Sequence, residues 1–188
     1  MLKDWIRDFM LKRQSEEARK APDTQARNVV NYQQVNQLGI LFHLTEDVDP
    51  EPLAQFLKKL EQDHKKIKLL TYLETTHSHP YRFYIDFFRK DDIPWTGKLE
   101  DVPKIRQFLD TPFDYLFCIE SEPQPMFHLL LQKSKANCRV GLFDQSRTNL
   151  FEMMVDNPDW KDLSHTLEQM LIYTRLLKND ATEDAQEI

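Results

Sequence analysis

The chain has 188 residues, of which 40% are hydrophobic and 30% are charged, and its formal net charge is -6. This length and composition suit one globular domain that folds without disulfides or metals. The acidic balance repels a phosphate backbone on average, so we expect no nucleic-acid partner.

The first predicted element is an amphipathic helix over residues 1–20. Its apolar side chains share one face: Leu2, Trp5, Ile6, Phe9 and Met10. Asp4 and Asp8 interrupt the apolar run, so the segment has the pattern of neither a signal peptide nor a membrane span. We expect the helix to dock on its own domain, on a protein partner or on a second copy of the chain. A membrane surface is the alternative, although the basic face is thin for that role.

Residues 28–178 are predicted to form a single α/β domain. Short apolar runs alternate with longer stretches of helical periodicity, which is typical of βαβ units. We predict strands at 38–44, 67–73, 82–88, 115–119 and 138–143, with 150–155 as a candidate sixth, and helices that begin after Asp49 and near residues 102, 125 and 158. This order favours a three-layer, mainly parallel, Rossmann-like or flavodoxin-like sheet of five to six strands with helices on both faces.

Two further expectations concern chain connections. Only about eight residues separate the second and third predicted strands, which is too few for a crossover helix, so we expect these strands to be antiparallel or far apart. Residues 179–188 carry four acids and no base, which predicts a disordered acidic tail.

The sequence lacks the common signatures of cofactor and catalytic sites. The only glycines are Gly39, Gly97 and Gly141, too far apart for a dinucleotide-binding, phosphate-binding or nucleophile-elbow motif. Cys118 and Cys138 lie in apolar runs, which indicates buried, reduced thiols and a cytoplasmic location. We therefore predict no cofactor, and binding in preference to catalysis.

His77 and His79 are the nearest approach to a metal motif, because alternate residues of an extended segment project to one side. Two ligands do not complete a site. A solvated polar turn accounts for the same residues, and we expect no bound metal.

Ligands of open α/β sheets bind at the carboxyl ends of the strands, so the residues that follow each strand are candidates. They form an acidic rim: Glu46, Asp47, Glu120, Ser121 and Asp144. Acids at these positions also serve as ordinary helix caps. The loop IPWTGK adds Trp95 and Gly97, since the Trp95 ring could cover a ligand or close the edge of its own core.

The layout from about residue 39 to residue 171 resembles a family of short bacterial α/β proteins of unknown function. The similarity includes the element Trp95-Thr96-Gly97-Lys98 after the third strand and the element at residues 135–141 before and in the fifth. Residues 113–144 are similar, more locally, to one unit of heptosyltransferase-like glycosyltransferases, with Arg139-Val140-Gly141 at the turn. Those enzymes have two such domains, so this likeness implies shared architecture only.

These observations favour a non-catalytic protein-protein or self-association module that acts through the N-terminal helix. The alternative is a protein that binds a nucleotide or nucleotide-sugar at the acidic rim, or an enzyme of glycosyltransferase-like ancestry that uses the same rim.

Overall fold

The computed structural model describes residues 2–21, 23, 25–74, 86–120, 122–156 and 162–177. Six parallel strands form one sheet in the order β3-β2-β1-β4-β5-β6. The strands are β1 (Gln37–Leu44), β2 (Lys66–Leu73), β3 (Asp86–Arg89), β4 (Tyr115–Ile119), β5 (Cys138–Leu142) and β6 (Met153–Val155). The α-helices are α1 (Leu2–Lys20), α2 (Glu51–Gln62), α3 (Pro103–Leu109), α4 (Pro125–Lys133) and α5 (Leu163–Leu176). The three-layer α/β class predicted from the sequence is confirmed.

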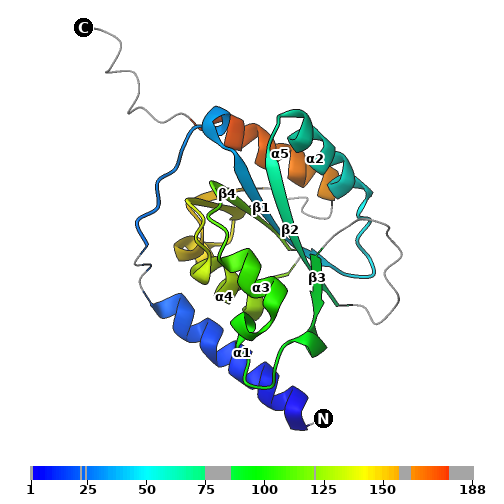
Figure 1. The fold of residues 1–188 in the computed structure, drawn as a ribbon, viewed down its shortest axis with the longest axis vertical. Helices are drawn as coiled ribbons and strands as arrows, with labels where there is room; N and C mark the ends of the chain where they lie inside the picture. The colour runs from blue at the N-terminus through cyan, green and yellow to red at the C-terminus, as the bar shows by residue number, and fades with distance from the viewer. Residues whose placement is uncertain are drawn as a thin grey trace, which may run out of the picture.

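Helices cover both faces of the sheet (Figure 1). Helices α2 and α5 lie on one face, where Phe56 and Leu60 of α2 and Met170 of α5 join a core of strand side chains such as Phe117. Helices α1, α3 and α4 lie on the other face, over a second core. Strands β1 and β4 are apolar on both sides because each is buried between these layers, as parallel strands usually are.

The strand order follows from right-handed crossovers. The connection from β1 through α2 leads to β2 on one side of β1, and the connection from β4 through α4 leads to β5 on the other side. Because the two halves grow in opposite directions, the crossover helices α2 and α4 fall on opposite faces. The direction of growth reverses between β1 and β4, and in this fold that switch point is where ligands bind.

The prediction for the third strand was wrong in direction. Strand β3 pairs parallel with β2, and Leu70 lies opposite Asp86. The structure gives β3 as Asp86–Arg89, and residues 82–85 of the predicted strand lie outside the described residues. His77 and His79 lie outside the described residues, as do residues 179–188.

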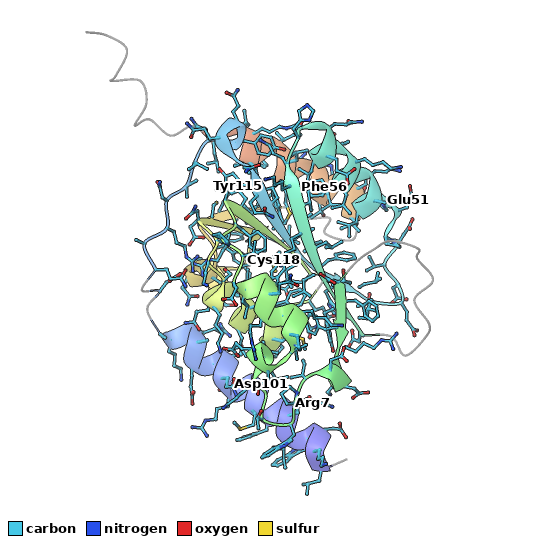
Figure 2. The ribbon with its side chains drawn as sticks, in the orientation of Figure 1. Arg7, Glu51, Phe56, Asp101, Tyr115 and Cys118 are labelled. Atoms are coloured by element: carbon cyan, nitrogen blue, oxygen red, sulfur yellow. The ribbon has the colours of Figure 1, made fainter. Side chains whose placement is uncertain are left out.

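Helix α1 docks on its own domain through its less apolar side. Arg7, Leu11, Ser15 and Ala18 are buried, and Arg7 donates to the carbonyl of Ile93 across 3.2 Å. Figure 2 shows Arg7 on the side of α1 that faces the domain. The predicted apolar face is left largely in solvent. No helix in the described part of the chain is long and apolar enough to cross a membrane.

Arg139 of β5 joins the amino end of the sheet to the segment that follows α1. Its side chain is buried and pairs with Glu152 through Nη2 at 2.6 Å and through Nε at 3.0 Å, and with Asp23 at 2.8 Å. A charge so deeply buried requires such partners. The Arg139-Val140-Gly141 segment therefore has a structural explanation in this fold.

Candidate functional site

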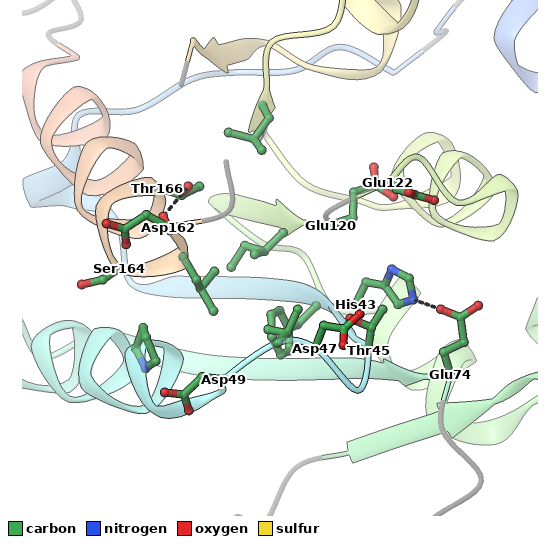
Figure 3. Close-up of a pocket in the computed structure, with 16 residues that line it drawn as sticks. His43, Thr45, Asp47, Asp49, Glu74, Glu120, Glu122, Asp162, Ser164 and Thr166 are labelled. Atoms are coloured by element: carbon green, nitrogen blue, oxygen red, sulfur yellow. Dashed lines mark hydrogen bonds and ion pairs between the residues drawn. The ribbon is translucent and has the colours of Figure 1, made fainter. Parts of the chain in front are cut away.

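A cavity of about 720 Å³ opens at the carboxyl end of the sheet, at the switch point between β1 and β4. Its volume is in the range of sites for small molecules. Phe42 and His43 of β1 and Ile119 of β4 form part of the wall, and the start of α5 forms another part. Figure 3 shows this cavity with its polar side chains labelled.

The cavity is lined by carboxyl groups to an unusual degree. Six of the described lining residues are acidic: Asp47, Asp49, Glu74, Glu120, Glu122 and Asp162. None of the described lining residues is lysine or arginine. Glu120 is neutralised by an ion pair with the buried Arg147. The remaining carboxylates give the cavity a net negative potential, and low-dielectric walls strengthen such a field.

Three helices begin beside this cavity. At each beginning, a carboxylate of the chain itself accepts a hydrogen bond from a backbone N–H. Asp49 accepts from the backbone N–H of Glu51 at the start of α2, at 3.0 Å. Glu120 accepts from the N–H of Gln124 before α4, at 2.9 Å, and Asp162 accepts from the N–H of His165 in α5, at 3.0 Å. Helix amino termini are the usual places where phosphate binds, because their N–H groups point outward. Here a carboxylate already bonds one N–H group at each beginning and adds negative charge there.

His43 is the one basic side chain among the described residues of the lining, and it is 3% exposed. Its Nε2 lies 3.2 Å from Oε2 of Glu74, while Tyr72 stacks on the ring at a centroid distance of 5.3 Å. Burial lowers the pKa of His43 below its ordinary value, although Glu74 and Glu122 act in the opposite direction. The imidazole is therefore neutral at neutral pH.

The neutral ring of His43 leaves one nitrogen unsatisfied. A carboxylate only accepts hydrogen bonds, so the ring nitrogen that faces Glu74 carries the proton, and Nδ1 is left with a lone pair. Nδ1 is buried and has no hydrogen-bond partner among the described residues. A buried acceptor without a donor is costly, so this atom suits a ligand that donates an N–H.

The structure places two of the seven predicted site residues in the lining, namely Asp47 and Glu120. Glu46 is exposed beside Asp47 without lining the cavity, and Ser121 lies outside the described residues. Asp144 pairs with Arg147 at 2.9 Å and accepts from Ser146, so it belongs to a neighbouring cluster.

Trp95 and Gly97 lie away from the cavity, beside α1. Trp95 is 56% exposed, and a turn closes from the N–H of Gly97 to the carbonyl of Pro94 at 2.9 Å. Gln14 of α1 donates to the carbonyl of Thr96 at 3.2 Å. The Trp-Thr-Gly-Lys element therefore packs against the N-terminal helix.

Several lining residues were not predicted from the sequence. His43 could have been selected as a site residue, because it is polar and lies near the carboxyl end of an apolar strand. Glu74 could have been selected because it directly follows β2. The sequence analysis did not select Asp162, Ser164 and Thr166, because it expected the last helix to begin near residue 158. Helix α5 begins at Leu163, with Asp162 as its cap.

The fold and the cavity define a doubly wound α/β protein with a ligand-sized site at its switch point. The chain belongs to DUF6913, a family of unknown function, whose model matches residues 7–177. No curated protein and no solved structure matches the chain. The expected membership of an uncharacterised α/β family is thus confirmed, while the heptosyltransferase likeness finds no support.

Proposed function

We propose that this protein binds a small organic cation, an amine or a guanidinium compound, in the switch-point cavity. The observation that carries the proposal is the unsatisfied Nδ1 of His43, a buried acceptor in an acidic cavity. An ammonium N–H would satisfy this acceptor and would gain from the carboxylates around it. Binding, without any chemical step, is the role that these groups support.

The same groups argue against the two other ligand classes. A nucleotide or nucleotide-sugar would bring phosphate to a cavity whose carboxylates repel it and whose neighbouring helix beginnings each carry a carboxylate of the chain. A metal ion would need three or more His, Cys, Asp or Glu ligands close together, and the described residues contain no such group. An organic cation needs neither arrangement.

The first test is thermal unfolding and calorimetry with butylamine and methylguanidinium, with butanol as the uncharged control. A ligand that binds only the folded chain raises the unfolding midpoint, so the two cations should raise it and butanol should not. Asp47→Asn or Glu122→Gln should each weaken cation binding about fivefold, since one charge at close range in water is worth about 1 kcal/mol.

Glu46→Gln is the matched control, because Glu46 is the exposed carboxylate next to Asp47 and does not line the cavity. Its cation affinity should equal that of the unmodified chain. Stabilisation by nucleotides or magnesium in place of amines would contradict the proposal, as would amines that have no effect at millimolar concentration.

A second candidate function is self-association through α1. Leu2, Trp5 and Phe9 are 71%, 64% and 52% exposed, and Trp5 stacks on Phe9 with ring centroids 5.7 Å apart. Across a two-fold axis, an antiparallel copy of α1 would set Trp5 of one chain against Phe9 of the other, so the stripe is complementary to itself. Three side chains bury little area, so we expect a weak dimer.

Sedimentation velocity over a concentration series tests this association. The average mass of the unmodified chain should rise with concentration, and that of the double variant Trp5→Ser/Phe9→Ser should stay monomeric. Both substitutions lie on the exposed side of α1, so the buried contacts of Leu11 and Ser15 are retained. A chain that is monomeric at every concentration excludes this candidate.

We also propose a cytoplasmic location for the protein. Cys118 and Cys138 are both free and buried, as the sequence analysis predicted. Burial raises the pKa of the Cys138 thiol to about 12, so the group stays protonated and unreactive. Unpaired thiols of this kind fit a reducing compartment.

A further inference from the structure

Apart from Glu120 and Glu122, the polar side chains of the cavity lie toward its two ends. In Figure 3, Asp162, Ser164 and Asp49 lie toward one end of the cavity, and His43, Thr45 and Glu74 lie toward the other, with Asp47 beside them. The first group comes from the beginnings of α5 and α2. The second comes from the carboxyl ends of β1 and β2 and the residues that follow.

The groups at both ends can accept hydrogen bonds from a cation. At the first end, Asp162 and Asp49 each use one carboxylate oxygen as a helix cap, which leaves the other oxygen available to a ligand. At the second end, Nδ1 of His43 lacks a donor, and the carboxylate of Asp47 is exposed on the lining. A single ammonium group could engage one end only.

The surface between the two ends is apolar. Phe42 and Ile119 are neighbours in the β1–β4 register and lie in the core under α2 and α5, and Val48, Leu142 and Leu163 pack against the same core. A ligand that reaches both ends must cross these side chains. A hydrocarbon spacer would bury apolar area there, whereas a polar spacer would lose hydrogen bonds to water.

We infer that the ligand is an elongated dication, a linear alkyl diamine or a close analogue, with one cationic group held at each end of the cavity. This inference rests on the proposed function and specifies the ligand class of the same site. The His43 group and the Asp162 group then act as two acceptor sites joined by an apolar floor. The number of carbons between the amines sets the affinity.

Calorimetry with a series of diaminoalkanes, from diaminopropane to diaminooctane, tests the inference. Affinity should pass through a maximum at one chain length, and the best diamine should bind at least tenfold more tightly than the alkylamine of equal length. The amino alcohol of equal length should bind like the monoamine, because it carries one cation and has the same reach.

Two variants locate the ends. Asp162→Asn keeps a residue that caps helices well, so α5 should begin as before, and Asp47→Asn removes a charge at the other end. Each variant should weaken the best diamine about fivefold, and the double variant should bring it to the affinity of the monoamine. A monoamine should respond to only one of the two substitutions.

The outcomes separate this inference from the proposed function. Diamines that bind no better than monoamines at any chain length would overturn the dication while leaving cation binding intact. Absence of binding by every amine in the series would overturn both.

Discussion

His128 of α4 lies beneath α1, in a buried cluster of polar side chains. Its Nδ1 is 2.9 Å from Oγ of Ser15, and its Nε2 has no hydrogen-bond partner among the described residues. Burial, together with the nearby positive charges of Arg147 and Arg19, lowers the pKa of His128 to about 4. The folded chain therefore holds this imidazole in its neutral form.

The neutral state of His128 makes stability depend on pH. The unfolded chain binds a proton at this residue near pH 6.5, and the folded chain does so only near pH 4, so protonation favours the unfolded state. The contribution of His128 is complete above pH 6.5 and is lost as the pH falls toward 4. We expect a loss of about 2 kcal/mol in the free energy of unfolding over this interval.

Urea unfolding at a series of pH values measures this dependence. His128→Gln keeps a polar side chain near Ser15 and does not titrate, so its stability should fall less than that of the unmodified chain. His165→Gln, at an exposed position of α5, should behave like the unmodified chain. Parallel decline in the His128→Gln variant and the unmodified chain would show that another group is responsible.

At the scale of elements, the contact between α1 and the turn at residues 94–97 depends on a glycine. Gly97 has a φ of +71°, a left-handed conformation that other residues adopt at a cost. A Cβ at this position would lie 3.2 Å from Cβ of Met10 and 3.4 Å from the backbone nitrogen of Leu11. Both the turn and the close approach of α1 therefore require that residue 97 have no side chain.

Gly97→Ala should loosen α1 and leave the sheet intact. The left-handed conformation costs an alanine about 1–2 kcal/mol, and the methyl group presses on the backbone of α1. We expect faster amide hydrogen exchange in residues 7–18, with unchanged protection in β1 and β4. Lys98→Ala, next in the chain and exposed, is the control and should leave α1 protected. Equal protection of α1 in both variants would contradict this role of Gly97.

At the scale of the whole molecule, the sequence predicted the number, type and approximate bounds of most elements. The buried strands β1 and β4 and the helix α4 are continuous apolar runs or strongly periodic segments, and such patterns depend on local sequence alone. The direction of β3 was not predictable, because strand pairing depends on crossover handedness and on contacts distant in the sequence. For α1, the pattern indicated a helix but the wrong buried face, since Arg7 and Ser15 are buried by specific hydrogen bonds.

Part of the candidate site was predictable because it, too, depends on local sequence. Asp47 and Glu120 directly follow strands, and the rule that ligands bind at the carboxyl ends of strands was enough to select them. Asp162 comes to the cavity from the start of α5, and only the packing of α5 beside α2 brings it there. The unsatisfied state of the His43 Nδ1 depends on the position of Glu74, which no sequence pattern specifies.

The contact between Ser15 and His128 joins residues 113 positions apart. During synthesis at roughly 5–20 residues per second, α1 emerges about 6 to 23 seconds before the part of α4 that it packs on. Through that interval neither the apolar stripe of α1 nor its inward face can pack against the domain. Helix α1 is thus made well before the part of the domain on which it packs, and until α4 follows it is open to chaperones and proteases.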